Sequence, residues 1–448
     1  MLYAGGRGFR VRLREFGGVQ MFDRKRLVAL CGGLLLVGAW SGMTEAAAGS
    51  LKLKLIGEPV DVDEGETTNV GGISVAFNSV DGEYCVVWYD SRIEGQNDVY
   101  AQRVSTAGSL LGGDVTIICD AASQTDTSVA YSPVDNRYLM TWHYQNGPPG
   151  SPGFNHTYGA IASAAGGLLT DPIDISNGGL EPTLVYNSAG NEYFLEARNF
   201  AGGGVGGIRG QRVSSEGKLI GSGIAIATAG APAPAGQVAY NSNADQYLAT
   251  WRDQSASDLK GRVINADGSF ATSGKVISPI FPESGLAATV AFDPVNDRYL
   301  VVFATFCGGP VYGQFLGPGM EPIGEALVLV DGSARYAPFI GYDNHNAVYL
   351  LTWRNTDVSK LSVRLLDDDG TLLGDEVVIA GGFASDGPRV AVNVNDGGFI
   401  VTWEDSSQQP ARHDVLVQVL AVVQDADVTG DGVVDVLDLL AVLSGWGP

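Results

Sequence analysis

The sequence predicts an all-β protein, a seven-bladed β-propeller with four-stranded blades in which the N-terminal strand closes the last blade. Three observations predict it. A unit of 50 to 55 residues recurs seven times. Strands such as 84–88 and 299–303 are apolar on both faces, which requires a sheet on either side. No helical period appears between residues 50 and 423.

Aromatic residues mark the second strand of every unit. The first aromatic positions are Tyr84, Tyr138, Tyr193, Tyr247, Tyr299, Tyr349 and Phe399. Four residues later stand Trp88, Trp142, Ala197, Trp251, Phe303, Trp353 and Trp403. Five of the seven tryptophans in the chain occupy this position. Such a fixed period indicates stacked repeats that bury their faces against each other.

The remaining strands of each unit are predicted from turn signals. The first strand precedes a short polar turn, as at 74–78, and a glycine turn separates the third and fourth strands, as at 107–108. Residues 51–62 resemble the fourth-strand segments that begin at Gly217 and Gly370, whereas the seventh unit lacks a fourth strand of its own. The N-terminal strand is therefore expected beside residues 415–423. An open row of β-modules or a pair of sandwiches is the alternative.

Two segments resemble a known repeat. Trp88–Arg92 and Asp98–Arg103 are similar to the repeat of many secreted bacterial β-propellers of unassigned function. The resemblance covers roughly 370 residues and implies the fold of residues 49–423. It says little about activity, because propellers carry many unrelated functions.

Residues 1–48 have the order of a secretory signal: Arg24–Arg26, an apolar run over 27–40, and small residues ending at Ala48. Met1 and Met21 are both candidate start residues, and a membrane anchor is the alternative. The sequence thus predicts a secreted, extracellular or cell-surface bacterial protein with no membrane span after signal removal. The net charge of −23 argues against nucleic acid and anionic membranes and favours cations.

Variable loops are expected on one face of the propeller, and this face is the candidate ligand face. An acid or amide recurs two residues after the second aromatic position, at Asp90, Asp253, Asn355 and Asp405. Such a ring could bind cations or sugar hydroxyls. The structural alternative is that these side chains satisfy turn backbones.

Two further sets carry weaker signals. His143 and His156 lie near Tyr144 and Tyr158, a combination that serves acid–base chemistry in some polysaccharide lyases. Glu196 interrupts an apolar strand and is interpreted either as half of a buried pair with Arg198 or as a catalytic carboxylate.

The C-terminal segment, 424–448, has a different character and is predicted to form a short calcium loop followed by a helix over 439–444. Oxygen-bearing groups occupy positions 1, 3, 5, 7, 9 and 12 of a loop, with Gly432 at position 6: Asp427, Thr429, Asp431, the Val433 carbonyl, Asp435 and Asp438. A loop of this kind supplies the oxygens that Ca²⁺ prefers. An acidic turn without metal is the alternative.

This segment resembles a type I dockerin repeat. The resemblance implies Ca²⁺ as the cofactor, bound by those six residues, and docking onto a cohesin-like or cell-surface module. The family usually has two such repeats and Asn or Asp where this chain has Thr429, so both docking and affinity are expected to be weaker here.

Together these features predict a secreted, calcium-binding propeller that is a non-catalytic binding or scaffold protein, with a polysaccharide or protein ligand on the propeller face. Two alternatives remain. One is a glycan-active enzyme, a glycoside hydrolase or polysaccharide lyase, and the other is a structural protein attached to the cell surface by its tail. The ligand and the oligomeric state are not predicted.

Overall fold

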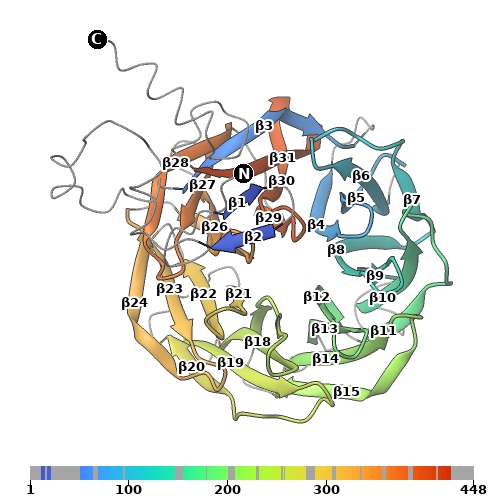
Figure 1. Ribbon diagram of the computed structural model, residues 1–448. Coiled ribbons are helices and arrows are strands. Elements are labelled where there is room, and N and C mark those ends of the chain that lie inside the picture. Colours follow the sequence, from blue (N-terminus) through green and yellow to red (C-terminus); the bar gives the residue numbers. More distant parts are fainter. Residues whose placement is uncertain are drawn as a thin grey trace, which may run out of the picture. The chain divides into compact units, whose positions relative to one another are not determined.

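The computed structural model (Figure 1) describes residues 12–15, 18–21, 51–63, 69–93, 96–146, 155–177, 179–199, 207–228, 232–253, 256, 258–278, 288–304, 309–332, 335–355, 360–381, 387–409 and 412–424. The chain divides into a compact unit of Leu53–Val422 and a second unit of Met1–Lys52 and Val423–Pro448. In the second unit, β1 (Arg12–Glu15) pairs with β2 (Gly18–Met21). The rest of the predicted signal and the whole predicted calcium loop lie outside the described residues. No helix of the described chain is long and apolar enough to cross a membrane.

Leu53–Val422 contains the seven sheets that the repeats predict. The first sheet consists of β4 (Val70–Asn78), β5 (Glu83–Asp90), β6 (Asp98–Ser105) and β7 (Val115–Ile118). The second consists of β8 (Ser123–Ser132), β9 (Arg137–Gln145), β10 (His156–Ser163) and β11 (Ile173–Asn177). The third consists of β12 (Gly179–Asn187), β13 (Glu192–Asn199), β14 (Gly207–Ser214) and β15 (Leu219–Ala227). In the fourth, the innermost position is divided between β16 (Pro232–Ala235) and β17 (Ala239–Asn241), followed by β18 (Gln246–Asp253), β19 (Asp258–Asn265) and β20 (Lys275–Ser278).

The fifth sheet is β21 (Thr289–Asp293), β22 (Arg298–Ala304), β23 (Val311–Leu316) and β24 (Pro322–Val330), and the sixth is β25 (Arg335–Asp343), β26 (Val348–Asn355), β27 (Lys360–Leu366) and β28 (Leu372–Gly381). The seventh is β29 (Arg389–Val392), β30 (Phe399–Gln409), β31 (Arg412–Gln424) and β3 (Leu51–Asp61). Every described element is a strand, as the missing helical period predicts.

The N-terminal strand closes the seventh sheet, as predicted. The Val62 N–H donates to the Val415 carbonyl at 2.9 Å, and the Gln418 side chain donates to the Ile56 carbonyl at 3.0 Å. The seventh blade also contacts the first, because the Asn395 side chain donates to the Ser79 carbonyl at 2.8 Å.

The seven sheets form a closed ring within this unit. Each innermost strand packs on the next, in the cyclic order β4, β8, β12, β17, β21, β25, β29 and back to β4. This arrangement excludes an open row or a pair of sandwiches. In Figure 1 the strands from β4 to β31 follow one another around the axis.

The repeated aromatic residues form the core between blades. Tyr84, Tyr193 and Tyr349 are at most 1% exposed. Trp88 and Trp403 are likewise buried in the second strands. Buried strand-end amides and acids tie neighbouring blades together: Asn187, for example, donates to the Tyr247 hydroxyl at 2.8 Å. The period that identifies the repeat is therefore the period of the packing between sheets.

Candidate functional site

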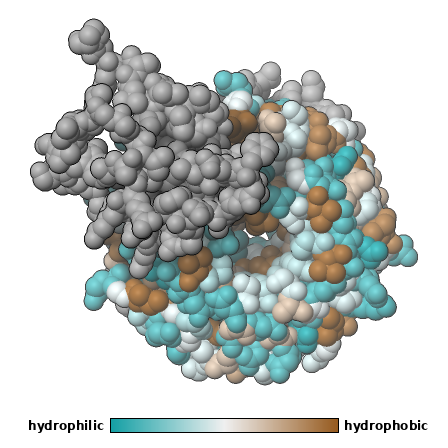
Figure 2. All heavy atoms as spheres, in the orientation of Figure 1, coloured by the Kyte–Doolittle hydropathy of each residue, from teal (hydrophilic) through white to brown (hydrophobic). Residues whose placement is uncertain are grey.

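A cavity of about 340 Å³ lies at the axis of the ring, where the innermost strands begin. Figure 2 shows the ring surrounding a hollow at its centre. Most of the wall consists of Gly, Ser, Thr, Ala, Pro and Val residues of strands from all seven blades. The larger or charged exceptions are Asp126, Glu181, Leu184, Gln237, Phe339 and Arg389. Small neutral residues thus shape most of this surface.

β-Bulges in the innermost strands create part of the wall. The pairing of β4, β8, β12 and β25 with their second strands shifts register at equivalent points. The first bulged residue has a positive φ in each: 56° at Gly72, 48° at Asp126, 52° at Glu181 and 46° at Ala337. Bulges re-aim side chains, and strained backbone of this kind is concentrated at functional sites. Here the bulged residues belong to the cavity wall.

Three charged residues line the cavity, and each of the two acids has a neighbour outside it. Glu181 lies 3.4 Å from the guanidinium of Arg198, and Asp126 lies 3.7 Å from His143. The Arg389 guanidinium donates to the Gly387 carbonyl at 2.9 Å. Two carboxylates from the neighbouring strands β8 and β12 and one cation from β29 therefore line one surface.

Asp90, Asp253 and Asn355 of the predicted ring end their second strands, whereas Asp405 lies within β30. None of the four lines this cavity. Asp90 is buried and accepts hydrogen bonds from the Trp88 indole at 2.9 Å and from the Arg92 main chain at 3.0 Å. Asp90 therefore accepts hydrogen bonds from the main chain of the following turn and from its own strand, as expected for a structural role of this carboxylate.

The other three members of the ring differ from one another. Asp253 accepts a hydrogen bond from Lys260 at 2.6 Å. Asn355 is opposite Lys360 in the neighbouring strand β27. Asp405 is 6% exposed and opposite Asp414 in β31. Ligand binding by the four ring residues stays a prediction. Asp90 and Asp253 both form hydrogen bonds within their own blades.

The histidine and tyrosine set is brought together on β9 and β10. The Tyr144 and Tyr158 rings lie 4.8 Å apart, and His156 lies 2.7 Å from Asp174. His143 is buried between the Thr125 hydroxyl at 2.9 Å and the Asn155 side chain at 3.0 Å. Burial lowers the pKa of His143 to about 4, so its imidazole is neutral at pH 7.

Glu196 is fully buried, but its predicted partner is elsewhere: Arg198 forms its ion pair with Glu181. Neither carboxylate oxygen of Glu196 has a hydrogen-bond partner in the part of the chain that the structure describes. Burial raises its pKa well above the usual range, which keeps the group neutral. Glu196 does not line the cavity.

Sequence reasoning missed Asp126 and Glu181. The sequence does contain a signal. Asp126 and Glu181 each stand two residues before the repeated first-strand motif, which begins at 128 and at 183. At the equivalent position other units have Gly72, Ala337 or Gly387. An acid at this position departs from the repeat, and the packing that all seven blades share does not explain it.

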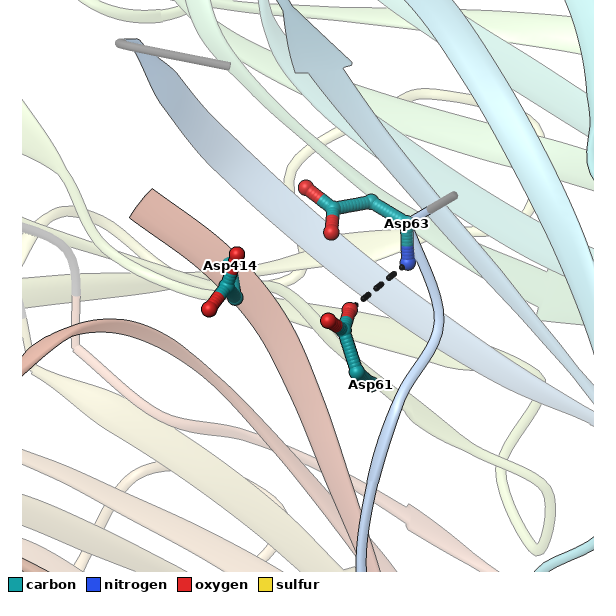
Figure 3. Close-up of side chains that lie close together, drawn as sticks. All are labelled: Asp61, Asp63 and Asp414. Carbon is teal, nitrogen blue, oxygen red and sulfur yellow. Dashed lines mark hydrogen bonds between the residues drawn. The ribbon is translucent and has the colours of Figure 1, made fainter. Parts of the chain in front are cut away.

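One group of acids among the described residues has the spacing of metal ligands. It consists of Asp61, Asp63 and Asp414, with one oxygen of each within 4.8 Å of the others. Figure 3 shows the three side chains, with the Asp63 main chain donating to Asp61. Sequence analysis gave no indication of this group, because Asp414 is distant from the other two in the chain.

Comparison with known proteins supports the fold. No protein-family model matches the chain, and no curated protein matches it. Among solved structures, a protein of unknown function from Dyadobacter fermentans is 10% identical, covering 83% of this chain and 99% of that one, with a TM-score of 0.50. Hydrazine synthase from Kuenenia stuttgartiensis is 10% identical over 82% of this chain and 97% of that one, with a TM-score of 0.51. Raptor from Chaetomium thermophilum is 9% identical over 83% of this chain and 29% of that one, also at 0.51. At such identities the likeness concerns the fold alone.

Proposed function

We propose that the chain is a secreted propeller that binds an extracellular polysaccharide or protein without transforming it, using the axial cavity and the loops around it. The observation that carries this proposal is the composition of the cavity wall, which is mostly Gly, Ser, Thr, Ala, Pro and Val. Such a wall offers main-chain groups and hydroxyls that hydrogen-bond a polar ligand, and apolar patches for its uncharged faces. A rigid ring holds these groups in place without a ligand.

The C-terminal loop enters the proposal as an attachment device. Ca²⁺ bound by Asp427, Thr429, Asp431, the Val433 carbonyl, Asp435 and Asp438 would order the segment and let it dock onto a cohesin-like or cell-surface module. The support is the ligand spacing in the sequence. Asp427→Ala together with Asp431→Ala is expected to lower the Ca²⁺ stoichiometry, measured by calorimetry; an unchanged stoichiometry would refute the site.

A glycan array with the full-length protein tests ligand binding, with and without Ca²⁺. Thr183→Trp places a bulky ring on the cavity wall and is expected to lower the signal on any bound glycan at least tenfold. The matched control is Val134→Trp, which changes an exposed turn residue outside the cavity. Arg389→Ala is a second wall variant with less steric demand. Equal signals for wild type and both wall variants would exclude the cavity as the binding site.

The alternative of a glycan-active enzyme is favoured by one observation, the presence of Asp126 and Glu181 on neighbouring strands of the cavity wall. Paired carboxylates provide the acid and base or nucleophile of glycoside hydrolysis. If the protein releases reducing sugar from a polysaccharide, Asp126→Asn and Glu181→Gln should each lower the rate by two or more orders of magnitude. Activity that survives both substitutions would place the chemistry elsewhere.

A further inference from the structure

The acids Asp61, Asp63 and Asp414 lie where the two ends of the ring meet. Asp61 ends β3, Asp63 lies two residues further along the link toward β4, and Asp414 belongs to β31. Between the acids, the Val62 N–H donates to the Val415 carbonyl at 2.9 Å. A main-chain bond therefore fixes the two segments at the point where the three carboxylates converge.

Asp63 shows that this group is more than an acidic surface patch. Its side chain is 4% exposed, and neither carboxylate oxygen has a hydrogen-bond partner among the described residues. Figure 3 shows the carboxylate reaching from the main chain into the space shared with Asp61 and Asp414. Leaving a buried carboxylate without a donor or cation is costly, so such groups are usually paired or bind a metal.

The groups that act electrostatically on Asp63 in the described part of the chain are other acids. Asp61, Asp414 and Asp90 all act on this side chain, and its burial adds to their effect. The guanidinium of Arg92, just after β5 in blade 1, is bonded to Asp90 at 2.7 Å and also to Asp114. It is thus committed to other acids.

We propose that Asp61, Asp63 and Asp414 bind one Ca²⁺ ion that joins β3 and its link to β31, as a calcium clasp on the ring closure. Three carboxylate oxygens within 4.8 Å of one another can all contact a single ion. Hard oxygen ligands select Ca²⁺ or Mg²⁺ over transition metals. Ca²⁺ is favoured because it accepts irregular geometry and completes its six to eight ligands with carbonyls and water, whereas Mg²⁺ demands a near-ideal octahedron.

This site is separate from the predicted loop at 427–438, and the experiment must distinguish them. Calcium binding and thermal unfolding are measured on the full chain after chelation, for wild type, for Asp427→Ala/Asp431→Ala, and for that variant carrying Asp63→Asn in addition. Asp63→Asn keeps the shape of the side chain and removes its charge. Glu325→Gln, an exposed acid of β24, is the matched control in the same background.

The tail variant is expected to retain one bound Ca²⁺ and a Tm that rises by several degrees at about 1 mM Ca²⁺, the range of extracellular calcium modules. Adding Asp63→Asn should abolish both effects, and adding Glu325→Gln should leave both intact. Asp414→Asn replaces Asp63→Asn if the latter does not fold. A tail variant that binds no Ca²⁺ would overturn the proposal.

A proton shared between Asp63 and its neighbours is the competing explanation. It predicts that Asp63→Asn changes stability equally with and without Ca²⁺ and leaves the stoichiometry of the tail variant unchanged, an outcome that refutes the clasp. Equal binding of Mg²⁺ by the tail variant would refute the assignment to Ca²⁺.

Discussion

At the scale of single residues, Glu196 is the clearest departure from the repeat. It lies in β13, opposite Thr183 and Gly210, on a strand whose neighbouring positions are apolar. Its burial raises its pKa, so the folded protein keeps a proton that the unfolded chain releases above a pH of about 4.3. The unfolding free energy is therefore highest, as far as this group is concerned, below the pKa of the unfolded chain. It falls as the pH rises from there toward the pKa of the folded protein.

Glu196→Gln is expected to remove the fall in unfolding free energy with rising pH, because glutamine does not titrate. The difference in unfolding free energy between variant and wild type should grow in favour of the variant from pH 5 to pH 8, by roughly 1–3 kcal/mol. Urea unfolding at the two pH values measures it. Glu216→Gln, at a side chain that is 64% exposed, is the control and should show no such change. A difference that stays constant with pH would mean that Glu196 is not neutral in the fold.

At the scale of strands, the bulges of the innermost strands shape the cavity. Gly72 has a φ of 56°, and a Cβ at this position would lie 2.8 Å from the Asp126 main-chain nitrogen. Glycine is thus required twice, for the backbone conformation and for the close approach of blades 1 and 2. Asp126, Glu181 and Ala337 adopt the same region of φ without being glycine. Each of them holds strain that the ring must offset.

Gly72→Ala separates these two requirements when it is compared with Gly82→Ala. Gly82 also has a positive φ, 66°, but a Cβ there meets nothing within 4 Å. Gly82→Ala is expected to cost about 1 kcal/mol of stability, the conformational part alone, and Gly72→Ala about 2–4 kcal/mol. Chemical denaturation measures both. Equal costs would show that the blades adapt to the added methyl group.

Ala337→Gly is the converse change at the equivalent bulge of blade 6. Glycine adopts a φ of 46° without the steric cost that alanine has. The greater conformational entropy of glycine in the unfolded chain offsets part of this gain, so we expect the unfolding free energy to rise by up to about 1 kcal/mol. A loss of more than 1 kcal/mol in the same denaturation experiment would contradict the strain argument.

At the scale of the whole ring, closure depends on β3. Without it, β31 would present an unpaired edge, and the bonds of Val62 to Val415 and of Gln418 to Ile56 would be lost. The seventh blade would then have to hold the ring together through β29, which contacts β4 and β25, and through β30, which contacts β4.

Deletion of residues 1–62 is therefore expected to lower the Tm by more than about 10 °C and to broaden the transition, as cooperativity between the blades is lost. Scanning calorimetry measures this, with deletion of residues 1–48 as the control that keeps β3. A Tm within a few degrees of the control would mean that the ring closes without the N-terminal strand.

The repeat in the sequence determined the number of blades, the strand order and the closing strand, because the packing of each sheet on the next imposes the same aromatic and apolar positions seven times. Separate patterns in the sequence predict the signal segment, most of which lies outside the described residues, and the calcium loop, all of which lies outside them. The same periodicity identified the ring residues on the second strands, and none of them lines the axial cavity: Asp90, Asp253, Asn355 and Asp405.

Only the tertiary structure decided which side chains converge. Asp126 and Glu181 reach the cavity through bulges, and a bulge depends on the register between strands, which the pattern of one strand does not specify. Asp63 meets Asp414 only when the last strand pairs with the first, so a contact between opposite ends of the chain creates the acidic group. The sequence contains the period of the sheets, whereas the sites depend on departures from that period and on the closure of the ring.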